Sequence, residues 1–199
     1  MAPPSAHGRG AARALWRRDG DAPAGRPEMA EADVPMGSSN TAQAALLVAA
    51  GSALALAAAW YFQLVVGLAP CPLCLDQRIP YYVGAPLALV AFGAAQSGRM
   101  GTARALMGVL FLLMLANVGL ASFHAGVEWR FWAGPTSCTG APAAATGSIL
   151  DAIKGARVPR CDEAAWRLFG LSMAGWNALI AAALAACALL GATSGRNRA

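Results

Sequence analysis

The chain has 199 residues, of which 57% are hydrophobic and only 13% are charged, and its mean hydropathy is +0.48. Soluble domains carry about 25% charged residues, so this composition excludes an ordinary soluble domain and indicates an integral membrane protein. The formal net charge is +5. The arginines are scattered, however, and no basic stripe alternates with aromatic residues, so we expect no nucleic-acid binding.

Four long apolar runs follow a polar tail, and each has a length that lets an α-helix cross hydrocarbon. Residues 1–40 have no hydrophobic period and are predicted to be disordered. A membrane domain is predicted at 41–193 and a second tail at 194–199. The fold class is therefore an all-α bundle of four transmembrane helices with two cysteine-bearing outer loops. The predicted spans are about 44–68, 79–95, 106–123 and 168–192, and the outer loops are 69–78 and 124–167.

The short loops decide the predicted orientation. Arg99 and Arg104 flank the connection between the second and third runs, and Arg196 and Arg198 lie in the C-terminal tail, with no acidic residue in either segment. By the positive-inside rule both segments are cytoplasmic. Both termini are then cytoplasmic and both cysteine loops lie on the outer side of the membrane.

The long outer loop contains a flexible linker composition at 139–147. Ser148 is a suitable N-cap for a short helix at 149–154, with Ile149 and Ile153 on one face. This helix would lie on the bilayer surface or pack on the bundle, and the sequence favours neither arrangement.

Cys71 and Cys74 form a Cys-x-x-Cys pair between the first two apolar runs. If a helix starts here, Pro72 occupies a favoured first-turn position and Cys71, Cys74 and Arg78 share one face. The helix N-terminus and the arginine both favour a reactive thiolate. A zinc site would need two more ligands at similar spacing, haem attachment would need a histidine after Cys74, and a two-residue loop is a weak structural staple. The motif therefore favours redox chemistry.

Cys138 and Cys161 bracket the flexible linker of the long loop. A structural disulfide is one interpretation of this pair. The surrounding segment 135–140 is expected to be mobile and exposed, which favours a weakly stabilised bond that exchanges with a partner.

His124 and Glu128 lie four residues apart at the end of the third run. They are interpreted either as polar groups at a membrane interface or as hydrogen-bond or proton donors to a lipid-soluble acceptor. Cys187 is interpreted as a packing residue, and Asn117 and Asn177 as interhelical hydrogen-bonding residues.

Together these motifs resemble the bacterial DsbB family of quinone-linked membrane thiol oxidases. The resemblance covers residues 44–192. It rests on the motif Cys71-Pro-Leu-Cys74-Leu-Asp-Gln-Arg78, the motif His124-Ala-Gly-Val-Glu128-Trp129, Cys138, and the segment from Cys161 through Trp166 to Trp176-Asn177. The long N-terminal tail and the Gly/Ala-rich linker after Cys138 depart from the family pattern.

The resemblance implies an enzyme of the bacterial inner membrane with its cysteine loops in the periplasm. Cys138 would accept electrons from a soluble thioredoxin-fold dithiol oxidase (DsbA-like), and the Cys138–Cys161 bond would re-form at the expense of Cys71–Cys74. Cys74 would face a quinone, either ubiquinone or menaquinone. Arg78, His124 and Glu128 would contact this quinone, and no metal is implied.

Two other interpretations stay open from the residues themselves. A related four-helix thiol oxidoreductase could reduce or isomerise disulfides. A membrane scaffold could instead use the four loop cysteines as metal ligands.

Overall fold

The computed structural model describes residues 36–139 and 160–195. They belong to one compact unit, Val34–Ala199, and a second unit, Met1–Asp33, lies outside the described residues. The predicted helix at 149–154 and most of the predicted N-terminal tail also lie outside them. The elements are α1 Met36–Leu64, α2 Pro72–Asp76, α3 Ile79–Gln96, α4 Met100–Glu128, α5 Thr136–Thr139, β1 Arg167–Leu168, β2 Leu171–Ser172 and α7 Met173–Thr193.

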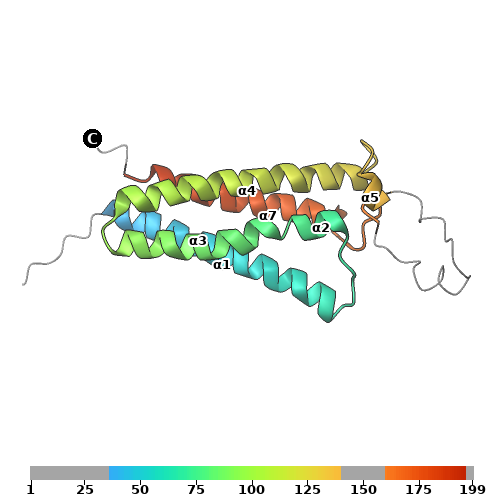
Figure 1. The fold of residues 1–199 in the computed structure, drawn as a ribbon, viewed down its shortest axis with the longest axis horizontal. Coiled ribbons are helices and arrows are strands. Elements are labelled where there is room, and N and C mark those ends of the chain that lie inside the picture. The colour runs from blue at the N-terminus through green and yellow to red at the C-terminus, as the bar shows by residue number, and fades with distance from the viewer. Residues whose placement is uncertain (1–35, 140–159, 196–199) are drawn as a thin grey trace, which may run out of the picture. The chain divides into compact units, whose positions relative to one another are not determined.

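Four segments are long and apolar enough to cross a membrane, which confirms the predicted fold class. They are Asn40–Leu64, Pro72–Gln96, Met100–Glu128 and Met173–Thr193. In the bundle, α1 and α4 each pack mainly against α3 and α7 (Figure 1). Small side chains let the helices approach closely, and the core includes Ala45, Ala88, Ala91 and Ala188 around Met107.

Most helix boundaries differ from the predicted spans, and α4 extends beyond the predicted span 106–123 at both ends. Helix α1 starts at Met36, inside the predicted tail, and ends at Leu64, before a turn in which Gly67 has a φ of 79°. Glycine adopts this left-handed conformation without a steric penalty. The second span starts earlier, at Pro72, and is divided into α2 and α3 by a turn at Gln77 and Arg78.

The predicted start of the fourth span at residue 168 is wrong, because residues 167–172 form a β-hairpin. Its strands β1 and β2 are antiparallel, with Leu168 opposite Leu171. The two turn residues, Phe169 and Gly170, both have positive φ, as a two-residue hairpin turn of the favoured hand requires. Helix α7 then starts at Met173, where the Ser172 hydroxyl oxygen accepts a hydrogen bond from the Gly175 amide.

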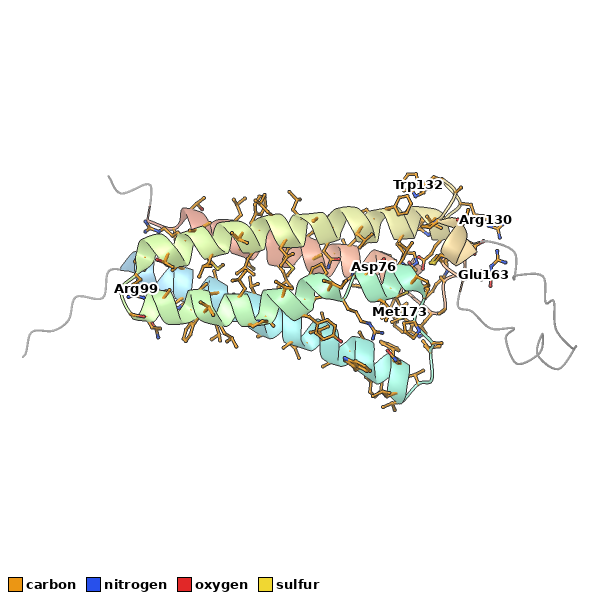
Figure 2. All side chains as sticks on the ribbon, viewed as in Figure 1. Asp76, Arg99, Arg130, Trp132, Glu163 and Met173 are labelled. Carbon is orange, nitrogen blue, oxygen red and sulfur yellow. A yellow bond between two sulfur atoms is a disulfide. The ribbon has the colours of Figure 1, made fainter. Side chains whose placement is uncertain are left out.

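One end of the bundle gathers the predicted chemistry and is called here the cysteine end. It consists of α2, α5, the last turn of α4, residues 160–163 and the hairpin. Figure 2 shows Asp76, Arg130, Trp132, Glu163 and Met173 at this end and Arg99 at the opposite end.

Candidate thiol–disulfide site

Cys71 is the N-cap residue of α2, as the motif predicted. Its sulfur accepts a hydrogen bond from the Cys74 amide over 3.2 Å, and Pro72 occupies the first turn. Cys71 is buried and Cys74 is half-buried, and both are free thiols in the structure. A side-chain hydrogen bond between the Cys71 and Cys74 thiols, followed by burial, raises the pKa of the Cys71 thiol, whereas the bond from the Cys74 amide lowers it, so Cys71 holds its proton at neutral pH.

Cys138 and Cys161 form a disulfide whose Cα atoms lie 5.4 Å apart, within the usual range. This is the pairing that the resemblance implied. The expectation of an exposed bond is wrong, because Cys138 is 5% exposed and Cys161 is fully buried. Helix α5 holds Cys138 against the end of the bundle, where Leu73 and Val127 cover the bond.

The two cysteine pairs meet at His124. The Cys71 and Cys161 sulfurs and a ring nitrogen of His124 all lie within 4.8 Å of one another. The Cys71 sulfur is 3.7 Å from His124 Nε2. One sulfur of each pair therefore needs only a small movement to bond to the other. The S–S distance in a disulfide is about 2.05 Å.

A cavity of about 210 Å³ lies beside the first cysteine pair. It is bordered by Cys71, Cys74, Arg78, His124 and Glu128. Its lining includes residues 55–62 of α1, in the C-terminal part of the helix that diverges from α3 (Figure 1). Its walls are mostly apolar and include Ala55, Ala59, Phe62, Trp166, Trp176 and Ile180. The cavity thus contacts the Cys71–Cys74 pair, whereas Cys138 and Cys161 do not border it.

Arg78 enters this cavity without a carboxylate partner among the described residues, whose ion pairs involve only His124 and Arg160 as cations. Its guanidinium donates hydrogen bonds to the Gln63 side-chain oxygen over 2.7 Å and to the Ala59 carbonyl over 3.4 Å. It also lies 5.6 Å from the centre of the Trp60 ring. Hydrogen bonds thus fix the guanidinium in position, but no carboxylate in the described part of the chain neutralises its charge. Such a group favours an anionic or strongly polarised ligand.

His124 and Glu128 are buried by the protein, with side chains only 4% and 5% exposed. This burial does not fit the interpretation as polar groups reaching the interface. Glu128 Oε1 lies 3.9 Å from His124 Nε2, while Glu128 Oε2 has no hydrogen-bond partner among the described residues. A buried, unsatisfied carboxylate oxygen at a cavity indicates a site for an incoming group or proton.

Gln77 and Tyr81 were missed by the sequence analysis, although Gln77 immediately precedes Arg78. Asn177 donates to Gln77 Oε1 over 2.7 Å and accepts from the Tyr81 hydroxyl over 2.5 Å, which confirms its interhelical role. Gln77 in turn contacts His124 Nδ1 over 2.7 Å. Asn117 is fully buried in α4 and makes no hydrogen bond of normal geometry to a described residue.

The cluster of Cys71, His124 and Cys161 is the one group of potential metal ligands found within residues 36–139 and 160–195. Cys161 is bonded to Cys138, so its sulfur is not available as a thiolate. The arrangement therefore favours sulfur exchange over metal coordination.

The family model of the disulfide bond formation protein DsbB matches residues 41–191. The chain belongs to the DsbB family. It is therefore a multi-pass membrane protein with redox-active cysteines and a disulfide-forming oxidoreductase.

Several curated DsbB proteins are similar over most of their length. The chain is 34% identical over 140 residues to disulfide bond formation protein B of Xylella fastidiosa strain Temecula1, covering 68% of this chain and 80% of the relative. Identities of 34% and 35% are found with the same protein of Xanthomonas oryzae pv. oryzae strain MAFF 311018 and Xanthomonas campestris pv. campestris strain 8004, covering 67% of this chain and 80% of each relative. No solved structure matches the chain.

Proposed function

We propose that this DsbB-family chain is a quinone-dependent protein-disulfide oxidase of the bacterial inner membrane. It re-oxidises a soluble periplasmic dithiol protein of the DsbA type and passes the electrons through its two cysteine pairs. The observation that carries the proposal is the approach of the Cys71 and Cys161 sulfurs to within 4.8 Å, beside a cavity that Cys74 and Arg78 border.

Electrons enter at the Cys138–Cys161 bond. A thiolate of the partner attacks Cys138, which forms a mixed disulfide and releases the Cys161 thiolate. The second partner thiol then attacks this mixed disulfide, so the partner leaves oxidised and Cys138 and Cys161 are both reduced. Because Cys138 is buried, α5 must move away from Leu73 and Val127 to admit the partner.

The electrons then pass inward. The Cys161 thiolate attacks Cys71 of an oxidised Cys71–Cys74 pair and displaces Cys74. Cys138 next attacks Cys161, which re-forms the Cys138–Cys161 bond and leaves Cys71 and Cys74 as thiols. This is consistent with the bonded outer pair and the free inner pair among the described residues.

The cavity fits a quinone on the evidence of its own residues. Its walls are apolar, as a lipid-soluble ring requires, and Arg78 provides an unneutralised donor for a ring oxygen. His124 and the unsatisfied Glu128 oxygen complete the polar side. When bound, a quinone accepts the two electrons and two protons that Cys71 and Cys74 give up as their disulfide re-forms.

The test uses the purified full chain with a reduced thioredoxin-fold dithiol protein and a soluble ubiquinone or menaquinone analogue. Cys71→Ser and Cys74→Ser should abolish quinone reduction, because each removes one sulfur of the inner disulfide. Cys138→Ser should block oxidation of the dithiol protein, since the sulfur it attacks is missing. Cys187→Ser, a half-buried position in α7, is the matched control and should retain full activity.

Normal oxidation of the dithiol protein by Cys138→Ser would refute the relay. Alkylation of thiols in whole cells separates the rival functions, because an oxidase rests with its pairs mostly oxidised and a reductase or isomerase does not. Tightly bound metal together with four free loop thiols would support the scaffold interpretation instead.

A further inference from the structure

A continuous chain of hydrogen bonds runs from the interior of the bundle to His124. Tyr81 of α3 donates to Asn177 Oδ1 of α7 over 2.5 Å, and Asn177 Nδ2 donates to Gln77 Oε1 over 2.7 Å. Gln77 Nε2 then lies 2.7 Å from His124 Nδ1 of α4. Tyr81, Gln77 and His124 are each at most 5% exposed and Asn177 is half-buried, so the protein shields most of this chain of hydrogen bonds from bulk solvent.

The direction of this chain fixes which ring nitrogen carries the proton. A side-chain amide has one accepting end and one donating end. Because Gln77 Oε1 already accepts from Asn177, Gln77 presents its donating NH₂ group to His124 Nδ1. Nδ1 must therefore accept, and the single proton of the neutral ring lies on Nε2.

The groups around Nε2 fit this polarity. Nε2 lies 3.9 Å from Glu128 Oε1, which accepts hydrogen bonds as a carboxylate oxygen, and 3.7 Å from the Cys71 sulfur, which as a thiol can accept or donate and so is compatible with this tautomer without selecting it. A reversed chain would instead direct the Nε2 lone pair toward a carboxylate oxygen, which is electrostatically unfavourable.

We propose that Tyr81, Asn177 and Gln77 act as positioning residues that hold neutral His124 in the Nε2–H tautomer, as a fixed hydrogen-bond donor to the exchanging sulfurs and the cavity. The catalytic part of this inference rests on the proposed function. Negative charge develops on sulfur during thiol–disulfide exchange, and a pre-oriented donor stabilises such charge. The same tautomer disfavours metal binding, since a protonated Nε2 cannot be a ligand.

The test reads the tautomer directly by nitrogen NMR of the full chain labelled with ¹⁵N-histidine, in detergent and at a pH where the ring is neutral. The chain has two histidines, so a His7→Gln variant assigns the signal of His124. The expected spectrum has a protonated Nε2 and an unprotonated Nδ1. No quinone or partner protein is needed, so this result is independent of whether the proposed function holds.

Two substitutions should reverse the tautomer. In Gln77→Glu a carboxylate can only accept, so Nδ1 must carry the proton. In Asn177→Asp the carboxylate accepts from the Gln77 amide. The Gln77 amide must turn to donate to it and then offers its oxygen to Nδ1, so the change reaches the ring through Gln77. The control is Gln96→Glu, the same substitution at the exposed far end of α3. It should leave the tautomer unchanged.

Both reversing variants should also slow exchange between the two cysteine pairs, by about a hundredfold if one donor is lost, while KM for the dithiol protein stays constant. Asn177→Leu covers the case in which Asn177→Asp does not fold. It frees the Gln77 amide to rotate and should give a mixture of both tautomers. A wild-type protein with the proton on Nδ1, or an unchanged tautomer in Gln77→Glu or in every folded residue-177 variant, would overturn the inference.

Discussion

Cys71 is both the N-cap residue of α2 and one of the sulfurs in the proposed disulfide exchange. Its place as N-cap directs its sulfur back toward the Cys74 amide, and the packing of α2 on α4 brings the same sulfur to His124. The Cys74 side chain, one turn later, borders the cavity. Both cysteines of the motif therefore border the cavity, and Cys71 in addition lies within 4.8 Å of the Cys161 sulfur of the outer pair.

Arg78 gives a direct test of the cavity at the residue scale. Arg78→Ala should raise KM for the quinone by about ten- to a hundredfold, because a charged hydrogen bond contributes roughly 1.5–3 kcal/mol. Arg78→Lys should recover part of the loss, since it keeps the charge but not the planar fork. Steady-state kinetics with varied quinone measures both effects. Arg99→Ala, at the opposite end of the bundle (Figure 2), should have normal kinetics, and an unchanged KM in Arg78→Ala would remove Arg78 from the site.

At the scale of elements, close contact between helices depends on small residues at defined positions. Gly191 of α7 lies against α1 and α4, and an added methyl there would be 2.9 Å from Ala44 Cβ and 2.7 Å from Met107 Cε. The methionine end can move aside, but Ala44 Cβ moves only with the backbone of α1. The Gly191 carbonyl also accepts a hydrogen bond from the Thr41 hydroxyl over 3.0 Å.

Gly191→Ala should therefore destabilise the bundle by about 1–3 kcal/mol, because α1 and α7 must separate. Gly119→Ala is the matched control, since it makes the same change in α4 with no atom within 4 Å of the added methyl. It should be neutral or slightly stabilising, as alanine favours helix over glycine. Unfolding in detergent measures both variants, and equal stabilities would contradict the packing argument.

For the whole molecule, orientation in the membrane follows from the proposed function, which needs the cysteine end in the periplasm. Single cysteines at Ser97 and Phe169, in a background whose native cysteines are serines, test this arrangement. Both positions are exposed, in the α3–α4 turn and the hairpin respectively. A membrane-impermeant maleimide should label Phe169→Cys in intact spheroplasts, and Ser97→Cys only after lysis. The reverse pattern would place the cysteine end in the cytoplasm.

The start of α7 and the burial of Cys138 were predicted wrongly because they depend on turn conformation and on packing, which the hydropathy of a segment does not contain. Hydropathy averages over a window, so the Phe169–Gly170 turn was hidden inside an apolar run that continues into α7. Similarly, the burial of Cys138 could not follow from its polar neighbours, because Leu73 and Val127 cover it from distant parts of the chain.

The sequence by itself determined that four segments can span a membrane, that a Cys-x-x-Cys motif stands at a helix start and that the chain resembles the DsbB family, because apolar length, capping residues and motif spacing are local along the chain. Only the tertiary structure decided which groups meet. Cys71 and His124 are 53 residues apart, and Gln77 and Asn177 are 100 apart. Their contacts depend on how α2, α4 and α7 pack and rotate against one another, which no local pattern specifies.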